Sequence, residues 1–505
     1  MISVPNLRLL LNGNKAFLLL FAGVFAFVGC STLKTGQGTG PDANANKQEK
    51  DQLEPIQATR VYDPIRGEWV VIPASPSEKM DTFKYKLVRP YYSTAVTYYP
   101  NSFPPDTRAK EEFFGKNVPA PEKSNPLRIA KKEQYKIIVA LPFTANDSEN
   151  AQEVVAGRVG RWAINYYGGI RLAARELNKE GVKINVLVRD TKSDDSGVTA
   201  LLTSPEMRET DVFIGPYRRE QIRAVADQAK KDNFIMFSPY SAVTGLVQAN
   251  PNFVQVNPSL EQHCRALLRN ARSEYAVEDI LLIYRANQAG EKTCAEYLQN
   301  ANAGLQGAQE PDFIPELVLD AGFTATNLAQ VIKNRPKMAV IIPSWADQNF
   351  ILTLLRRITE AKTEDQEIVV YGMPQWMEFQ NFEYDFFEKL RVRISSSSFV
   401  NLQDEEVKAF RRLYYEEFGS PPDLSAYEGF GLFRFIGKML NEYGKYFQYY
   451  MDVNPMTTLT TRYEFQSILE PGQGYQADLM KAVSRFENTF LNILEFREYQ
   501  FQVIR

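Results

Sequence analysis

Polar and aromatic side chains follow two neighbouring apolar runs of the sequence. Tyr217 and Arg218 come directly after "DVFIGP", and Ser238, Tyr240 and Ser241 end or follow the run "FIMF". Serine hydroxyls and loop N–H groups can orient a polar ligand, and tyrosine rings supply apolar stacking area. An arginine can pair with a carboxylate or phosphate, although Arg218 could equally be a solvated residue at a helix start. This spacing predicts a binding surface with a preference for an acidic group.

A second group of candidate binding residues follows two later apolar runs. Ser344 and Trp345 come after "MAVIIP", and Trp376 comes after "EIVVYGMPQ". Aromatic walls with a few polar groups suit an amphipathic or sugar-like ligand, or a protein partner. The alternative is that the two tryptophans pack in the core or at a hinge.

The composition argues against enzymatic chemistry. The chain has one histidine, His263, and three cysteines, so metal sites and histidine-assisted nucleophiles are difficult to build. No P-loop and no GxGxxG spacing is present. A net charge of −3 gives no bulk electrostatic attraction for nucleic acid. We expect a binding protein that is not an enzyme, with no cofactor, no metal and no nucleic-acid partner.

From Tyr135 onward, apolar runs typical of buried strands alternate with helical patterns. The runs "YKIIVALPF", "VKINVLVRDT", "FIGP" and "FIMFSP" form one series, and a second series begins near Asn257 with "EDILLIYRA". Such alternation predicts an α/β fold with parallel sheets. The number of strands favours two similar sheets over one. Ligands of open parallel sheets bind beyond the carboxyl ends of the strands, which is where both candidate groups stand.

The N-terminus has the pattern of an export signal. Arg8 and Lys15 precede the short apolar run "AFLLLFAGVFAFV", which is too short to span a bilayer comfortably. The tetrad "FVGC" resembles a bacterial lipobox, with Phe27 in place of the usual leucine. Its resemblance implies that Cys30 is lipidated and becomes the mature N-terminus; a plain signal peptide that contains a cysteine is the alternative.

The other two cysteines have apolar neighbours at helical spacing. Cys264 and Cys294 are therefore expected either as two buried thiols or as one disulfide in an exported protein.

Residues 30–134 are polar, rich in proline and weakly patterned. The stretch "TGQGTGPDANANKQEKDQ" after Cys30 predicts a long flexible tether. Further along, "RVYDPIRGEWVVIPASP" and "YKLVRPYYSTAVTYYP" mix apolar runs with prolines, so a short hairpin or strap and an extended spacer are equally compatible.

The order of the elements from Tyr135 to Arg505 resembles the type I periplasmic binding proteins, in particular the branched-chain amino-acid receptor-like ABC transporter substrate-binding lipoproteins. The stretches that carry the resemblance are "GGIRLAARELN", "VLVRDTKSD", "DVFIGP", "IMFSPYSA", "FVQVNPS" and "FRRLYYEEFGSPPDLSAYEGFGLFRFIGKML". Each is weak alone, and their order and spacing make the case.

The resemblance implies two lobes, each a mostly parallel sheet sandwiched by helices, with a ligand gripped between them by hinge closure. The chain would leave lobe one near Asn257, return near Val400 and cross again near Gly444. The expected division is a lipoprotein signal peptide over 1–29, a tether over 30–134, lobe one over 135–256 and 400–444, and lobe two over 257–399 and 445–505.

One departure bears on the ligand. Amino-acid-binding relatives receive the ligand carboxylate with small hydroxyl residues, whereas this chain has Tyr217, Arg218 and Ala242 at the matching positions. We therefore expect leucine, isoleucine and valine to bind weakly or not at all.

Two functions remain open at this point. The first is an envelope lipoprotein that binds a small solute between its lobes for an ABC-type uptake system. The second is a non-transport envelope scaffold or regulator that binds a protein or cell-wall partner. Either would be tethered through Cys30, with the outer membrane facing the periplasm as the expected location.

Overall fold

The computed structural model describes residues 59–63, 68–72, 85–88, 131–143, 158–192, 194–306, 312–319, 328–332, 335–379, 384–469 and 483–504. The expected signal peptide and Cys30 lie outside these residues. Of the expected tether, three strands are described: β1 (Thr59–Asp63) and β2 (Glu68–Ile72), which form an antiparallel hairpin, and β3 (Tyr85–Val88).

Lobe one is built on a seven-stranded sheet of order β16-β17-β8-β7-β6-β4-β5. Its strands are β4 (Tyr135–Leu141), β5 (Ile184–Asp190), β6 (Val212–Ile214), β7 (Ile235–Ser238), β8 (Phe253–Gln255), β16 (Phe465–Leu469) and β17 (Val483–Asn488). Only the β16–β17 pairing is antiparallel. The strands are short apolar runs, so the sheet is buried on both faces, as expected for parallel strands.

Helices cover both faces of this sheet. One hydrophobic core joins it to α4 (Arg158–Lys179) and α13 (Leu424–Tyr443), and a second core joins it to α5 (Ser196–Thr203) and α6 (Arg219–Asp232). α12 (Glu405–Phe418) packs outside α4 and α13 through Val407, Phe410 and Tyr414.

Lobe two is built on an eight-stranded sheet of order β19-β18-β13-β12-β11-β9-β10-β3. Its strands are β9 (Ile280–Arg285), β10 (Glu316–Leu319), β11 (Lys337–Ile341), β12 (Glu367–Gly372) and β13 (Arg393–Ser396), which are parallel, and β3, β18 (Asn492–Arg497) and β19 (Gln500–Val503), which pair antiparallel. α7 (Leu260–Glu274) packs against α8 (Ala289–Gln306). α10 (Gln348–Ala361) packs against α9 (Leu328–Ile332) and α11 (Tyr384–Lys389).

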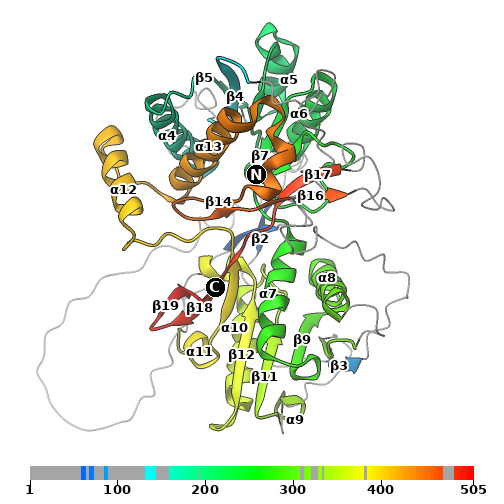
Figure 1. Cartoon of the computed structure of the whole chain (residues 1–505). Helices are drawn as coiled ribbons and strands as arrows, with labels where there is room; N and C mark the ends of the chain where they lie inside the picture. The colour runs from blue at the N-terminus through cyan, green and yellow to red at the C-terminus, as the bar shows by residue number, and fades with distance from the viewer. Residues whose placement is uncertain are drawn as a thin grey trace, which may run out of the picture.

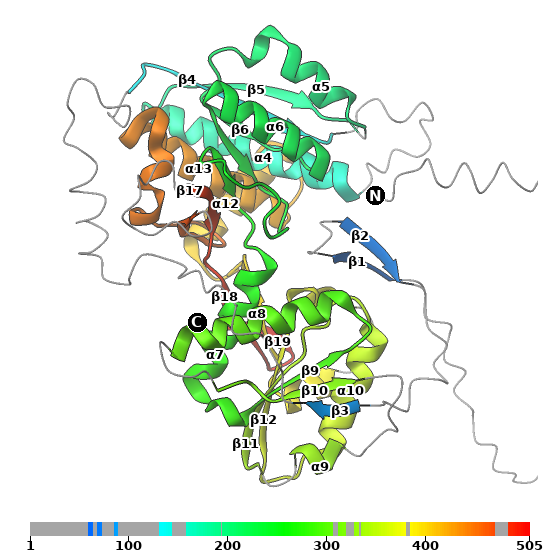
Figure 2. The same ribbon diagram turned by 90° about the vertical axis from the view of Figure 1, so that its right-hand side faces the viewer.

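The chain crosses between the lobes three times, at residues 256–259, 397–404 and 489–491. The first two crossings leave from the carboxyl ends of β8 and β13, which run parallel to β7 and β12 beside them. The carboxyl ends of the parallel strands in each lobe therefore face the other lobe. Figure 1 shows the two lobes stacked with these segments between them, and Figure 2 shows the same arrangement from the side.

The C-terminal region differs from the sequence-based division. We expected 445–505 in lobe two, with a crossing near Gly444. Instead, Phe447, Phe465 and Phe486 pack into the lobe-one core, and β16 and β17 extend the lobe-one sheet. Only β18 and β19 join lobe two, so the third crossing comes after Asn488.

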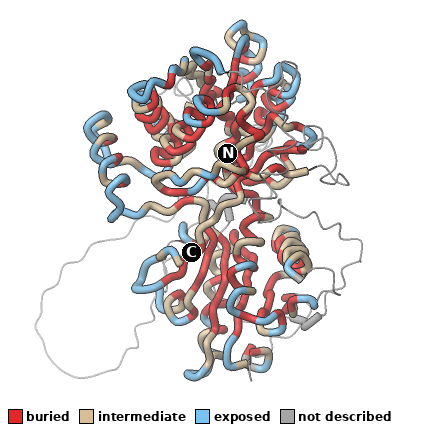
Figure 3. Tube along the Cα trace, viewed as in Figure 1, coloured by how far each residue is buried: buried red, intermediate tan, exposed pale blue. Residues whose placement is uncertain are grey.

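The central strands of both sheets are buried, and the outer helices carry exposed faces (Figure 3). The edge strands β5 and β19 are partly exposed. The α4–α13 contact in lobe one is unusually close. A Cβ atom added at Gly169 would lie 2.0 Å from the Ala426 carbonyl oxygen, and one at Gly429 would lie 2.1 Å from the Tyr166 carbonyl oxygen. Glycine at these two positions lets the helix backbones touch, which fixes where α4 presents its first turns.

Buried charges tie the C-terminal strands to lobe two. Glu495 on β18 is fully buried and accepts hydrogen bonds from Arg391 and Arg393 at 3.0 and 2.6 Å, and from Arg497. Burial alone would raise the pKa of Glu495, but the three arginines outweigh burial and lower it to about 2. Glu495 is therefore ionised in the folded protein at neutral pH.

Candidate functional site at the facing lobe edges

The first candidate group lies where expected, at the carboxyl ends of β6 and β7. Ser238 is the last residue of β7 and is fully buried, and Ser241 is 5% exposed. Tyr217, Arg218 and Tyr240 are partly exposed. The two serines predicted to orient a ligand are thus below the surface. The aromatic rings and the arginine form the accessible edge.

An aromatic cluster covers this edge of lobe one. Trp162 on α4 lies 5.7 Å from Tyr217 and 5.3 Å from Tyr240, measured between ring centroids, and the two tyrosine rings are 4.1 Å apart. Trp162 also stacks on Tyr166 at 4.9 Å. We call Trp162, Tyr166, Tyr217 and Tyr240 the aromatic lip. Each such ring pair contributes about 0.5–1.5 kcal/mol beyond the burial of area.

Sequence reasoning did not single out Trp162. It stands in the stretch "RVGRWAINYY", more than 20 residues after β4. The helical pattern of this stretch does not indicate how close Trp162 lies to the loops after β6 and β7. The sequence offered one signal for this residue: the start of the helix is polar, yet it carries a tryptophan close to two tyrosines.

Arg218 is engaged at the protein surface. It is the N-cap of α6, and its Nη1 lies 3.3 Å from Asp195 Oδ1. Both side chains are more than a third exposed, so the ion pair contributes little to stability.

The second candidate group is more deeply placed than predicted. Ser344 and Trp376 are fully buried and Trp345 is 5% exposed. The Trp376 indole N–H donates to the Ser344 carbonyl oxygen at 2.7 Å. A Cβ at Gly372 would lie 2.4 Å from the Trp376 ring, so this ring packs on the end of β12. Of the two alternatives for Trp376, the structure therefore favours a core residue over an exposed aromatic wall.

A charged cluster occupies the same edge of lobe two. Arg285, the last residue of β9, donates to Asp347 at 2.7 Å and to Glu291 at 3.0 Å, and its guanidinium lies 4.1 Å from the Phe350 ring centroid. Asp347 is the N-cap of α10, where it accepts from the Phe350 N–H, and Glu291 lies in the first turn of α8. The protein's own carboxylates thus occupy two helix N-termini that would otherwise attract an anion.

The model of the periplasmic binding protein family matches residues 154–448, which is more than half of the chain. The chain belongs to the periplasmic binding protein family. No curated protein matches the sequence.

Solved structures agree with the fold of a type I periplasmic binding protein. A protein from Rhodospirillum rubrum, provisionally assigned as a branched-chain amino acid ABC transporter, is 15% identical with a TM-score of 0.51, over 74% of this chain and 100% of that one. A branched-chain amino acid ABC transporter periplasmic ligand-binding protein from Burkholderia xenovorans LB400 is 11% identical with a TM-score of 0.50, over 74% and 95% of the two chains. At these identities the likeness concerns the fold alone.

Glu428 adds a titratable group behind the aromatic lip of this periplasmic binding protein. It lies in the second turn of α13 and accepts a hydrogen bond at 2.9 Å from Ser398, which belongs to the second crossing segment. Burial raises the pKa of Glu428 to about 7, and the nearby Tyr166 and Tyr463 phenols have raised pKa values for the same main reason. Nothing in the sequence distinguished this glutamate from an ordinary helical residue.

The only histidine takes part in a buried pair. His263 Nδ1 lies 2.8 Å from Ser395 Oγ, and burial lowers the pKa of His263 to about 4. Ser395 is fully buried in β13 and His263 is 7% exposed. A substrate would not reach this pair, which instead satisfies two polar groups inside lobe two.

Cys264 on α7 and Cys294 on α8 are both buried and are not joined in a disulfide. In the part of the chain that the structure describes, no group of three metal-ligating residues is found, and no helix is both long and apolar enough to cross a membrane.

Proposed function

We propose that this periplasmic binding protein is an envelope lipoprotein that binds a small solute between its lobes, as the substrate-binding protein of an ABC-type uptake system. The observation that carries the proposal is the aromatic lip at the carboxyl ends of β6 and β7, on the lobe edge that faces lobe two. Ligands of such sheets bind at this edge, and hinge closure would complete the site.

The residues nearest to such a ligand have distinct roles in this proposal. Trp162, Tyr217 and Tyr240 supply apolar and stacking area, and Arg218 supplies a positive charge at the rim. On the opposite edge, Trp345, which is 5% exposed and lies two residues before Asp347, is the proposed aromatic contact. Ser238, Ser241, Ser344 and Trp376 support these side chains from below.

A second function is favoured by a specific feature of both edges. The aromatic rings of lobe one pack on one another, and the helix N-termini of lobe two are occupied by Glu291 and Asp347. Such surfaces, whose aromatic and charged groups already contact one another, suit a non-transport envelope scaffold or regulator that binds a protein or cell-wall partner.

Mass spectrometry of small molecules retained by the purified protein distinguishes the two functions. A solute that the wild type retains and Tyr240→Ala does not retain supports the uptake function. If no solute is retained and an envelope protein co-purifies, the scaffold function is supported.

We expect leucine, isoleucine and valine to bind weakly or not at all. Their carboxylate would need exposed hydroxyls or open helix N-termini, but Ser238 and Ser241 are buried and the lobe-two N-termini carry carboxylates. Isothermal titration with each amino acid is the measurement. Micromolar binding that survives both Tyr240→Ala and Arg218→Ala would show that the ligand class and the site are both wrong.

The proposed membrane anchor predicts a clear change in location. Mature protein should begin at Cys30 and carry acyl chains, because more than one chain gives stable attachment. Cys30→Ala should leave the protein unprocessed or release it from the outer-membrane fraction, as followed by cell fractionation and intact-mass analysis. Ser31→Ala is the matched control and should fractionate as wild type. Native protein with an unmodified N-terminus upstream of Cys30 would contradict the anchor.

A further inference from the structure

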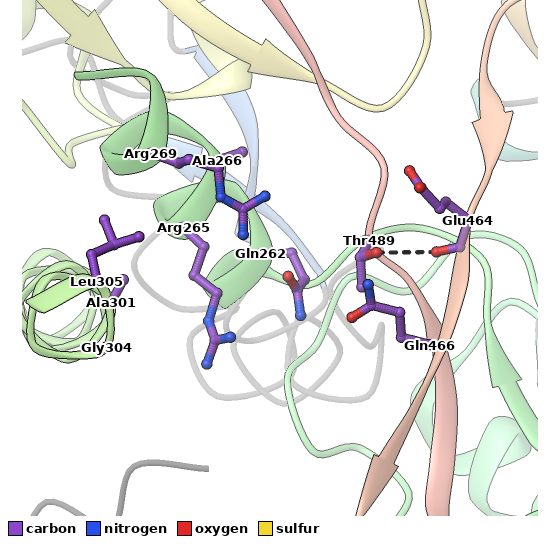
Figure 4. Close-up of a pocket in the computed structure, with 10 residues that line it drawn as sticks. All are labelled: Gln262, Arg265, Ala266, Arg269, Ala301, Gly304, Leu305, Glu464, Gln466 and Thr489. Carbon is purple, nitrogen blue, oxygen red and sulfur yellow. Dashed lines mark hydrogen bonds between the residues drawn. The ribbon is translucent and has the colours of Figure 1, made fainter. Parts of the chain in front are cut away.

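The third crossing segment is held to lobe one by groups that do not titrate. The N–H and the hydroxyl of Thr489 both donate to the Glu464 carbonyl oxygen, at 3.1 and 3.0 Å. Figure 4 shows this contact as a dashed line, at the edge of a pocket that α7 and α8 also line. A change of pH alters neither the donors nor the acceptor of these bonds.

The first and second crossing segments are instead held by carboxyl groups of lobe one. The Ser259 N–H donates to Glu487 Oε1 on β17 at 2.9 Å. The Ser398 hydroxyl donates to Glu428 Oε1 on α13, also at 2.9 Å. Arg485 Nη2 lies 3.3 Å from Glu487 Oε2 and balances its charge. Among the described residues, however, no cation forms an ion pair with Glu428.

The groups around Glu428 disfavour its ionised form. The Tyr166 phenol on α4 and the Tyr463 phenol on β15 (Arg462–Tyr463) both lie close enough to interact electrostatically with its carboxyl group. Asp423, the N-cap of α13, adds a second acidic group, and α12 adds the Tyr414 phenol, which interacts with Asp423. None of these groups supplies a positive charge.

The net effect on Glu428 is a strong preference for the neutral carboxyl group. Burial raises the pKa of Glu428 to about 7, the hydrogen bond from Ser398 opposes this shift, and the Asp423 carboxylate adds to it. The charge of Glu428 therefore changes within about one pH unit of neutrality.

The second crossing segment connects Glu428 to lobe two. Ser398 comes two residues after the end of β13, and Phe399 beside it packs against the lobe-two core. Val400 packs instead against the lobe-one cluster of α12 and α13. The chain thus passes from one lobe to the other at the hydrogen bond itself. Residues 397–403 carry no charged side chain, so nothing in this segment offsets a charge on Glu428.

From this arrangement we propose that protonation of Glu428 controls the hinge at the second crossing segment. With a neutral carboxyl group, the segment can pack over Glu428, as in this structure, without burying a charge. Ionisation favours arrangements in which the segment moves away from α13 and water reaches the carboxylate.

The proton acts in this proposal as an effector with different affinities for two lobe arrangements. By linkage, separation of the lobes at this hinge releases a proton, and low pH favours the packed arrangement. The proposal rests on the two-lobed architecture and does not depend on the uptake function proposed above.

Distances between spin labels on the two lobes test the proposal. Glu220→Cys in the first turn of α6 and Gln288→Cys after β9 place labels at exposed positions beside the facing edges, while the native Cys264 and Cys294 are buried. Double electron–electron resonance is recorded on the full-length protein in detergent, from about pH 5.5 to about pH 8.5. A longer-distance population should grow with pH, with a midpoint near the pKa of Glu428, about 7.

Variants assign the change to Glu428. Glu428→Gln mimics the neutral carboxyl group and should keep the low-pH distances at every pH. Ser398→Ala removes the hydrogen bond that lowers the pKa of Glu428, so the midpoint should rise by roughly half a pH unit or more. Glu416→Gln is the matched control, because Glu416 is exposed on α12 and forms no ion pair among the described residues. It should titrate as wild type.

The proposal is overturned if the wild-type distances do not change across this pH range, or if the change persists in Glu428→Gln. Circular dichroism melts matching the wild type establish that each variant is folded. Should Glu428→Gln not fold, Ser398→Ala decides, because an unchanged midpoint in that variant contradicts the proposal. Loss of the pH response in Glu416→Gln would assign it to surface charge and would also overturn the role of Glu428.

Discussion

Replacing Glu495 by Gln is expected to lower the free energy of unfolding of lobe two by about 3 kcal/mol at neutral pH. The carboxylate is fully buried and neutralises Arg393, whose side chain is only 3% exposed. Glutamine keeps the shape and removes the charge, so among the described residues Arg393 retains only the half-buried Glu274 as an ionic partner. Breaking a buried ion pair from one side typically costs 3–5 kcal/mol. Urea denaturation followed by tryptophan fluorescence reports this, since Trp345 and Trp376 both lie in the lobe-two core.

The loss of stability in Glu495→Gln is expected to depend on pH. The pKa of Glu495 is lowered from 4.5 to about 2, so the folded state binds fewer protons than the unfolded state between these values. The stabilisation is fully present above pH 4.5 and is lost as the pH falls toward 2, by up to about 3 kcal/mol. The difference between wild type and Glu495→Gln should therefore shrink across this window. A difference that stays constant from pH 7 to pH 2 would contradict the role of the charge.

A neighbouring glutamate provides the control. Glu498 lies at the β18–β19 turn, three residues away, and is exposed. Glu498→Gln changes the net charge by the same amount without removing a buried partner. It should alter stability by no more than about 0.5 kcal/mol. An equal loss in both variants would assign the effect to net charge alone.

The sequence was sufficient for the two-lobed α/β fold because apolar runs of strand length alternate with amphipathic helices from Tyr135 onward. It was insufficient for the C-terminal region. The runs "YEFQSILEP" and "FLNILEFREYQ" have similar apolar content, so composition does not say which sheet each one joins. That choice was made by tertiary pairing: β17 lies beside β8, whose outer edge was open in lobe one, while β18 lies beside β13.

For the candidate site, the sequence predicted at which strand ends the residues lie, but not how deeply each side chain is buried. Strand ends mark where side chains meet at a sheet edge, which correctly brought Tyr217 and Tyr240 together. Whether such a residue is exposed depends on what covers it. Ser238 lies at the end of a buried strand, and Trp376 fills the space left by the missing side chain of Gly372. Trp162 reaches the same edge from α4, whose position depends on a helix contact with α13, more than 250 residues further along the chain.

That helix contact leads to the other large expected effect, from Gly429→Ala. In an exposed helix this change stabilises by about 1 kcal/mol, because alanine has the higher helix propensity. Here the new Cβ would lie 2.1 Å from the Tyr166 carbonyl oxygen, and a backbone atom cannot rotate away as a side chain would. The helices must separate, which disrupts the lobe-one core around Phe433 and Ile436. We expect a loss of about 3 kcal/mol or more, at the upper end of overpacking effects.

Gly431→Ala on the same helix is the matched control. The three atoms nearest to its Cβ would all belong to the Thr458 side chain, the closest at 3.0 Å, so we expect a change within about 1 kcal/mol of wild type. The fluorescence of Trp162, which packs against the lobe-one core, would report the separation of α4 from α13 in Gly429→Ala. Tyr166 carries both the carbonyl group that clashes with the new Cβ and the ring on which Trp162 stacks. Moving α4 away from α13 should therefore loosen the aromatic lip as well as the core. Equal stability of the two variants would mean that the close approach of α4 and α13 does not hold this edge in place, and the lip would need another support.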